Sequence, residues 1–176
     1  KKQKYLYLVT YGIAFFIGIG ALYQLNIILY AKRILDLGDA QTAVLLSALG
    51  VGIGVGSLFA GKVSDGKVEI GLVPLGAFGL GLASLLLAAL PFNFYVVSFY
   101  LVFLGFSAGM YIVPLNAFLQ ARSPSDLKGE YIAASNALSF TAMLFFSVFL
   151  WLGIDILGFS PRGVFLFGSF LCFILT

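Results

Sequence analysis

The sequence predicts an all-α membrane protein in which six helices form one bundle. Three observations support this prediction: the hydropathy of the chain, its long uninterrupted apolar runs, and a sequence match between two of those runs. Of the 176 residues, 61% are hydrophobic and only 10% are charged, whereas soluble domains carry about 25% charged residues. The mean hydropathy is +1.09. Such a chain cannot cover itself with polar surface in water, so we expect an integral membrane protein.

Six apolar runs are separated by short polar connections. The first run is uncharged and long enough to cross a bilayer of about 30 Å as a tilted helix, and it lacks the cleavage site of a signal peptide. Because the runs are continuous and do not alternate, the strands of a membrane β-barrel are excluded. The expected helices cover residues 5–30, 43–60, 70–90, 94–119, 132–152 and 164–176. The last run is shorter than the roughly 20 residues that a helical span needs, so we expect a truncated helix.

Two of the runs carry nearly the same short sequence. Residues 25–32 and 115–122 share Leu, Asn, Leu and Ala at equal offsets, and each segment ends on a cation. Asparagine is uncommon in an apolar helix because its side chain needs a partner there. We interpret the match as an internal repeat. Since the first and fourth spans cross the membrane in opposite directions, it predicts two three-helix repeats of inverted topology.

The charges of the connections predict the orientation. Cations collect on the cytoplasmic side of membrane proteins, and placing the N-terminus in the cytoplasm gives the larger number inside. The connection containing Asp65, Lys67 and Glu69 is then cytoplasmic, and we expect its charges to pair and to determine topology. The expected inside cations are Lys1, Lys2, Lys4, Lys62, Lys67, Arg122 and Lys128, and the outside ones are Lys32, Arg33 and Arg162.

The composition excludes several kinds of function. The net charge of +3 does not indicate nucleic-acid binding, because the cations stand singly and form no basic patch. The chain has no histidine, and its one cysteine, Cys172, lies in an apolar run, so neither a disulfide framework nor a metal site is expected. No charged residue lies deep in a span, so these spans by themselves are poor candidates for proton coupling, and any ion coupling would have to come from residues outside them. We expect no catalytic residues and no cofactor.

Amide side chains within the spans are the first candidates for a binding site. Asn116 and Gln120 share one face of the fourth span, where they either line a central cavity or bond a neighbouring helix. Gln120 lies close to Arg122, at the expected cytoplasmic interface. In the first span, Gln24 and Asn26 point about 200° apart on a helix. We expect Gln24 to face the cavity and Asn26 to bond another helix.

The start of the fifth span is also unusually polar. Asn136 and Ser139 share a face and are the second candidate lining of a cavity. The alternative is that hydroxyl groups there bond their own helix backbone, as serine and threonine often do. The candidate substrate-binding residues are therefore Gln24, Asn116, Asn136 and Ser139.

Glycines in the second and fourth spans have the spacing of close helix contacts. Small residues four positions apart let two membrane helices approach each other, and such a surface also suits helices that rock. A nucleotide-binding glycine loop is excluded, because that motif follows a strand in a soluble domain. We expect packing or hinge roles for Gly50 and Gly54, with Gly52 and Gly56 similarly spaced, and for Gly105 and Gly109.

A proline interrupts the fourth span. Pro114 has no backbone N–H to donate to the carbonyl of Met110, so we expect the helix to bend or open near this point. Broken helices flank the substrate sites of many transporters, although proline kinks are common in membrane helices generally.

Two stretches resemble a known family. Residues 67–77 (KVEIGLVPLGA), and residues 113–120 (VPLNAFLQ) together with 133–136 (AASN), are similar to the C-terminal half of the lysophospholipid transporters of the major facilitator superfamily. The similarity extends in layout over most of the chain. It implies helices seven to twelve of a twelve-helix transporter, preceded by an N-terminal six-helix half. The matching positions are Glu69, Pro74, Pro114, Asn116, Gln120 and Asn136.

The resemblance implies a function. That family moves lysophospholipid, chiefly lysophosphatidylethanolamine, from the outer to the inner leaflet of the bacterial inner membrane, where an acyltransferase restores the second chain. It also occurs fused to, or encoded with, a 2-acylglycerophosphoethanolamine acyltransferase. The expected partners are thus the lysophospholipid, membrane lipids, the N-terminal half and an acyltransferase domain, without nucleic acid. Because no cation lies deep in these spans, head-group charge recognition would fall to the other half.

Two alternatives stay open at this point. One is a major facilitator exporter or importer of a different amphipathic solute or drug. The other is the membrane domain of a bifunctional acyltransferase, in which the helices mainly anchor an enzyme.

Overall fold

The computed structural model describes residues 2–65, 68–89 and 93–174, with only the backbone of residues 2–4. Within these ranges it contains six α-helices and no strand, which confirms the all-α prediction. Five helical segments are long and apolar enough to cross a membrane. The helices are α1 (Lys2–Arg33), α2 (Asp39–Ser64), α3 (Leu72–Ala89), α4 (Phe94–Arg122), α5 (Lys128–Trp151) and α6 (Pro161–Ile174), and a π-helical turn, η1 (Leu152–Ile156), follows α5 directly.

Several helices run past the apolar segments that predicted them. The last turn of α1 includes Lys32 and Arg33, because cations are favourable at the C-terminal end of a helix dipole. At the start of α4, the Asn93 side chain accepts a hydrogen bond of 3.0 Å from the backbone N–H of Val96 and caps the helix. α6 has 14 residues and is therefore about 21 Å long. Residues 90–92, at the predicted end of the third span, lie outside the described residues, as do residues 175–176.

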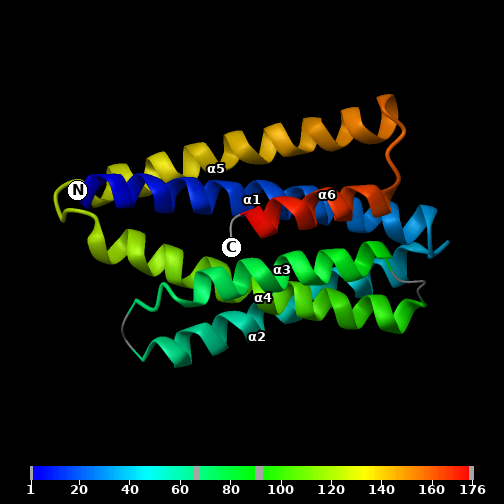
Figure 1. The fold of residues 1–176 in the computed structure, drawn as a ribbon, viewed down its shortest axis with the longest axis horizontal. Coiled ribbons are helices and arrows are strands. Elements are labelled where there is room, and N and C mark those ends of the chain that lie inside the picture. Colours follow the sequence, from blue (N-terminus) through cyan, green and yellow to red (C-terminus); the bar gives the residue numbers. More distant parts are fainter. Residues whose placement is uncertain (1, 66–67, 90–92, 175–176) are drawn as a thin grey trace.

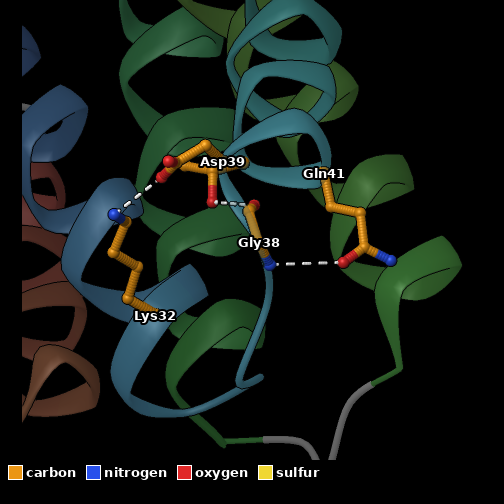
Figure 2. A network of polar contacts seen from close by, with 5 residues as sticks. Lys32, Gly38, Asp39 and Gln41 are labelled. Atoms are coloured by element: carbon orange, nitrogen blue, oxygen red, sulfur yellow. Dashed lines mark hydrogen bonds and ion pairs between the residues drawn. The ribbon is translucent and has the colours of Figure 1, made fainter.

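Polar contacts define the corner between α1 and α2 (Figure 2). Lys32 Nζ lies 2.7 Å from Asp39 Oδ1, and the backbone N–H of Gly38 donates to Gln41 Oε1 at 3.3 Å. Gly38 has no side chain, so only the returning half of a capping box is present. Asp36, in the turn, has φ of 51°, a left-handed conformation that Asp tolerates better than most residues. The exposed ion pair contributes little stability in water, but the turn sends α2 back antiparallel to α1.

The packing of the helices confirms the inverted repeat. α1 and α4 run in opposite directions, as do α2 and α5, and α3 and α6 (Figure 1). The most extensive contact of α2 is with α4, and that of α5 is with α1. α3 packs on α4 as α6 packs on α1, while α3 and α6 contact each other. This scheme is unchanged when the first three helices are exchanged for the last three, as a two-fold axis in the membrane plane requires.

The residue-by-residue correspondence of the repeat needs a correction. Asn26 and Leu115 are buried, whereas Leu25 and Asn116 are exposed. In burial, Asn26 therefore corresponds to Leu115 and not to Asn116, although the sequence match aligns the two asparagines. A shift of one residue turns a side chain by about 100° around its helix. The packing of the helices follows the repeat, but Asn26 is buried and Asn116 is exposed.

Four glycines bring α2 and α4 together along their backbones. A Cβ placed on Gly52 or Gly56 would collide with the backbone of Val102 or Phe106 on α4. A Cβ on Gly105 or Gly109 would collide with the backbone of α2 between residues 49 and 57. The prediction for Gly105 and Gly109 is thus confirmed as close packing, since only glycine permits such an approach.

Gly50 and Gly54 do not contribute to the contact between α2 and α4, and their packing or hinge role stays a prediction. No described atom lies within 4 Å of a Cβ built on either residue. Gly52 and Gly56 occupy the α4 side of α2 instead, because residues two positions apart point to nearly opposite sides of a helix.

Pro114 is buried inside α4. The helix continues from Phe94 to Arg122 and does not open at this residue. The missing backbone donor is therefore accommodated within a continuous helix, and a hinge role for Pro114 stays a prediction.

We expect Gly56→Ala to destabilise the protein, because the backbone of Phe106 cannot move aside without separating α2 from α4. Overpacking of this kind costs about 1–3 kcal/mol. Gly54→Ala is the matched control on the same helix: it meets no described atom and should be neutral or slightly stabilising. Thermal unfolding of the purified full-length protein in detergent measures both. Equal melting temperatures for the two variants would contradict the assignment of the tight contact.

Candidate functional site

Three hollows lie along the facing sides of α1 and α5. The first has a volume of about 480 Å³ and walls from α1, α2, α3, α4 and α5. Its lining is almost entirely apolar and includes Phe16, Ile53 and Met143, with Gln24 as its amide. The second, of about 410 Å³, lies between α1, α4 and α5. The third, of about 290 Å³, lies between α1, α5 and η1.

The three hollows adjoin one another. Ile17 and Met143 line both the first and the second, while Leu25 and Ser147 line both the first and the third. The order along the helices is therefore second, first, third, from the start of α1 toward its end. We call the three together the α1–α5 groove.

The groove exists because α1 and α5 do not approach each other as closely as α2 and α4. Along α1, a Cβ on Gly18 would meet the Phe146 ring and the Ala142 carbonyl of α5, but a Cβ on Gly20 would meet nothing. At Gly18 the side chain of Phe146 thus lies against α1, whereas α2 and α4 meet backbone to backbone. The equivalent pairs of the two repeats are used differently, one as a tight seam and the other as a groove wall.

Three of the four predicted binding residues come together in the second hollow. Asn116, Asn136 and Ser139 line it beside apolar side chains such as Ile112 and Phe140. Both asparagine side chains belong to exposed residues and remain able to donate and accept. Ser139 Oγ, however, donates to the Ser135 carbonyl at 2.8 Å. The alternative of a backbone-bonded hydroxyl is therefore confirmed for Ser139, which can only accept from a ligand in this geometry.

Gln24 lies apart from these three residues. It is exposed on the wall of the first hollow, about a turn beyond Gly20 toward the end of α1. Its amide is the main polar group on the otherwise apolar wall of this hollow. The structure thus separates the amides into a cluster in the second hollow and a single glutamine in the first.

Asn26 has the interhelical role that the sequence predicts. It is fully buried, and its Nδ2 donates to the Pro161 carbonyl at 2.9 Å. Pro161 is the first residue of α6, so this bond links α1 to the beginning of the last helix. The Asn26 Oδ1 atom is buried and finds no hydrogen-bond donor among the described residues.

Other contacts in this part of the bundle were not predicted from the sequence. Ser169 Oγ donates to the Gly81 carbonyl at 2.9 Å and joins α6 to α3. The third hollow contains Arg33, Trp151 and Asp155. In sequence Arg33 resembles an ordinary helix-ending cation, and Asp155 lies in a polar connection, so only the fold brings them to one hollow.

The predicted cytoplasmic connection is only partly described. Asp65 ends α2 with φ of 40° and is exposed, and Glu69 is exposed before α3. Lys67, the expected partner of Glu69, lies outside the described residues, so this pairing stays a prediction. α2 ends and α3 begins at the same end of the bundle as the start of α1 (Figure 1).

Comparison with known proteins gives one family match. The model of the Major Facilitator Superfamily matches residues 1–147 of the chain. No curated protein matches the sequence of this chain.

Replacing Asn26 should destabilise the fold while replacing Gln24 should not. Asn26→Ala removes the buried hydrogen bond that links α1 to the Pro161 carbonyl, which costs about 1–2 kcal/mol in a membrane protein. Gln24→Ala removes an exposed amide only two positions away, so it serves as the control. The melting temperature of the purified full-length protein measures the difference. A Gln24→Ala variant that melts as early as Asn26→Ala would mean that Gln24 has a structural partner.

Proposed function

The chain belongs to the major facilitator superfamily of membrane transporters, and on this premise we propose that it is the C-terminal half of a lysophospholipid transporter. Its substrate is of the lysophosphatidylethanolamine class. The full protein moves this lipid from the outer to the inner leaflet of the bacterial inner membrane, where an acyltransferase, separate or fused, adds the second chain. In this orientation the start of α1 is cytoplasmic.

The observation that carries the proposal is the polarity of the α1–α5 groove. A lysophospholipid has one polar head and one acyl chain, so it needs polar groups beside a long apolar surface. Asn116 and Asn136 offer amides in the second hollow, and the adjoining first hollow offers about 480 Å³ of mostly apolar wall. Burial of each CH₂ of the chain contributes about 0.8 kcal/mol, which suits an apolar wall better than a polar one.

Each candidate residue has a role in this proposal. The amides of Asn116 and Asn136 bond the glycerol hydroxyl and the ester carbonyl, and Ser139 accepts one further hydrogen bond. Gln24 bonds the lipid during its passage along the apolar part of the groove. These bonds are uncharged, so they are individually weak enough for the substrate to be released.

Transport proceeds by alternating access between this half and an N-terminal six-helix half. Rocking of two halves about a midplane site is the general mode of such folds. Gly50 and Gly54 support a close approach by the other half, because they leave an exposed small-residue surface on α2. A groove walled by α1, α2, α4 and α5 would then face that half and close or open as it rocks.

A different amphipathic solute or drug is the second candidate substrate, because an apolar groove with few amides also accepts such molecules. In the bifunctional acyltransferase alternative, these helices remain the transport domain, and an enzyme domain elsewhere in the chain performs the chemistry.

The decisive experiment is uptake of labelled lysophosphatidylethanolamine by the full-length protein in proteoliposomes. Phosphatidylethanolamine, with the same head and two chains, is the matched control substrate. Uptake of the one-chain lipid alone supports the proposal. Absence of lipid uptake, together with proton-driven export of an unrelated solute, would favour the second candidate.

Gln24→Ala and Asn116→Ala should each impair transport more than folded yield. Losing a neutral hydrogen bond of about 0.5–1.5 kcal/mol corresponds to a rise in KM of about two- to tenfold. Gln41→Ala removes an exposed amide at the α1–α2 corner, away from the groove, and should leave KM unchanged. Loss of both groove variants from the membrane fraction would instead indicate that the two amides are packing residues.

A further inference from the structure

We propose that Arg33 and Asp155 form an entry site for a zwitterionic lipid head group at the end of the α1–α5 groove. Arg33 binds the phosphate and Asp155 binds the ammonium group of lysophosphatidylethanolamine. This inference deepens the proposed function and rests on it. It places a cation for the head group within this half of the transporter, at the mouth of the groove rather than deep in a span.

The third hollow is lined by both residues, which come from different elements. Arg33 is the last residue of α1, and Asp155 lies in η1 immediately after α5. Both line the same space of about 290 Å³. Among the described residues, the ion pair that forms at this end of the bundle joins Lys32 to Asp39 and involves neither of them. Two oppositely charged residues that line one space without pairing with each other suit a ligand carrying both opposite charges.

The position of the hollow suits a lipid that enters from the membrane surface. Trp151 lines it and is 57% exposed, and tryptophan concentrates at the level of lipid head groups. The rest of the lining is apolar, including Ile28, Leu29 and Leu150. Because Leu25 and Ser147 also line the first hollow, an acyl chain could pass directly from this site into the apolar part of the groove.

The π-helical turn gives Asp155 a defined place. The Leu157 N–H donates to the Leu152 carbonyl at 3.0 Å, which is the wider hydrogen bond of a π-helix. The Phe159 N–H donates to the Gly153 carbonyl at 2.8 Å and closes the turn. Such turns are rare and occur frequently at functional sites. Here the turn continues the α5 face that bears Trp151, so that Asp155 follows it one helical turn later on the wall of the hollow.

The site predicts a distinct effect for each charge. Arg33→Gln should raise the KM for lysophosphatidylethanolamine and for lysophosphatidylglycerol by about tenfold, because both carry the phosphate. Asp155→Asn should raise the KM about tenfold for lysophosphatidylethanolamine alone, because lysophosphatidylglycerol has no ammonium group. Arg33→Lys should retain most of the affinity, since it keeps the cation.

The measurement is uptake of both lipids by full-length protein in proteoliposomes, with monoacylglycerol as a substrate that lacks both charges. Arg162→Gln and Asp36→Asn are the matched controls. Both residues are exposed at the same end of the bundle and do not line the third hollow. Asparagine also suits the left-handed backbone of residue 36. Neither control should change KM by more than about twofold.

The outcomes separate the site from the function. Wild-type protein that takes up neither lysophospholipid overturns the proposed function before any variant is compared. Active wild-type protein with Arg33→Gln equal to Arg162→Gln, or Asp155→Asn affecting both lipids equally, overturns the entry site alone. If Arg33→Gln fails to reach the membrane, the contrast between the two lipids for Asp155→Asn decides the question.

Discussion

The close backbone contact between α2 and α4 is the constraint on which the rest of the bundle depends. In lipid there is little hydrophobic driving force between helices, so they associate where their surfaces fit closely. Gly52 and Gly56 on α2 meet Gly105 and Gly109 on α4, with no side chain between the two backbones. α3 packs on the same α4, so this seam fixes one layer of three helices. The remaining helices then pack against that layer through α1 and α6.

The two repeats share a packing scheme but differ in what fills their contacts. The pair α1 and α5 corresponds to the pair α4 and α2, yet side chains such as Phe146 separate α1 from α5. An inverted repeat thus produces one tight seam and one groove from the same topology. The difference lies in a few residues, because a single Cβ decides whether two helix backbones can touch.

The polar residues of the membrane segments divide according to whether the fold supplies a partner. Asn26 is buried and bonds the Pro161 carbonyl, whereas Gln24, two positions earlier, stands on the wall of a hollow. Asn116 and Asn136 also remain open to a hollow. An amide facing hydrocarbon is costly, so residues kept in this state are candidates for binding. Asn116 and Asn136 thus make one end of the α1–α5 groove polar, and Gln24 is the amide of its otherwise apolar middle.

The sequence alone determined the class of the protein, because long uncharged runs can satisfy their backbone hydrogen bonds in lipid only as helices. It also predicted the inverted repeat, the interhelical bond of Asn26 and the close contact at Gly105 and Gly109. It could not decide which glycines of α2 meet α4, nor that Asn26 corresponds in burial to Leu115, because both depend on the rotation of a helix about its own axis. Only the tertiary structure placed Arg33 and Asp155 on the same hollow, since these distant parts of the chain are brought to one place by the packing of α1 on α5 and by a π-helical turn that no apolar pattern encodes.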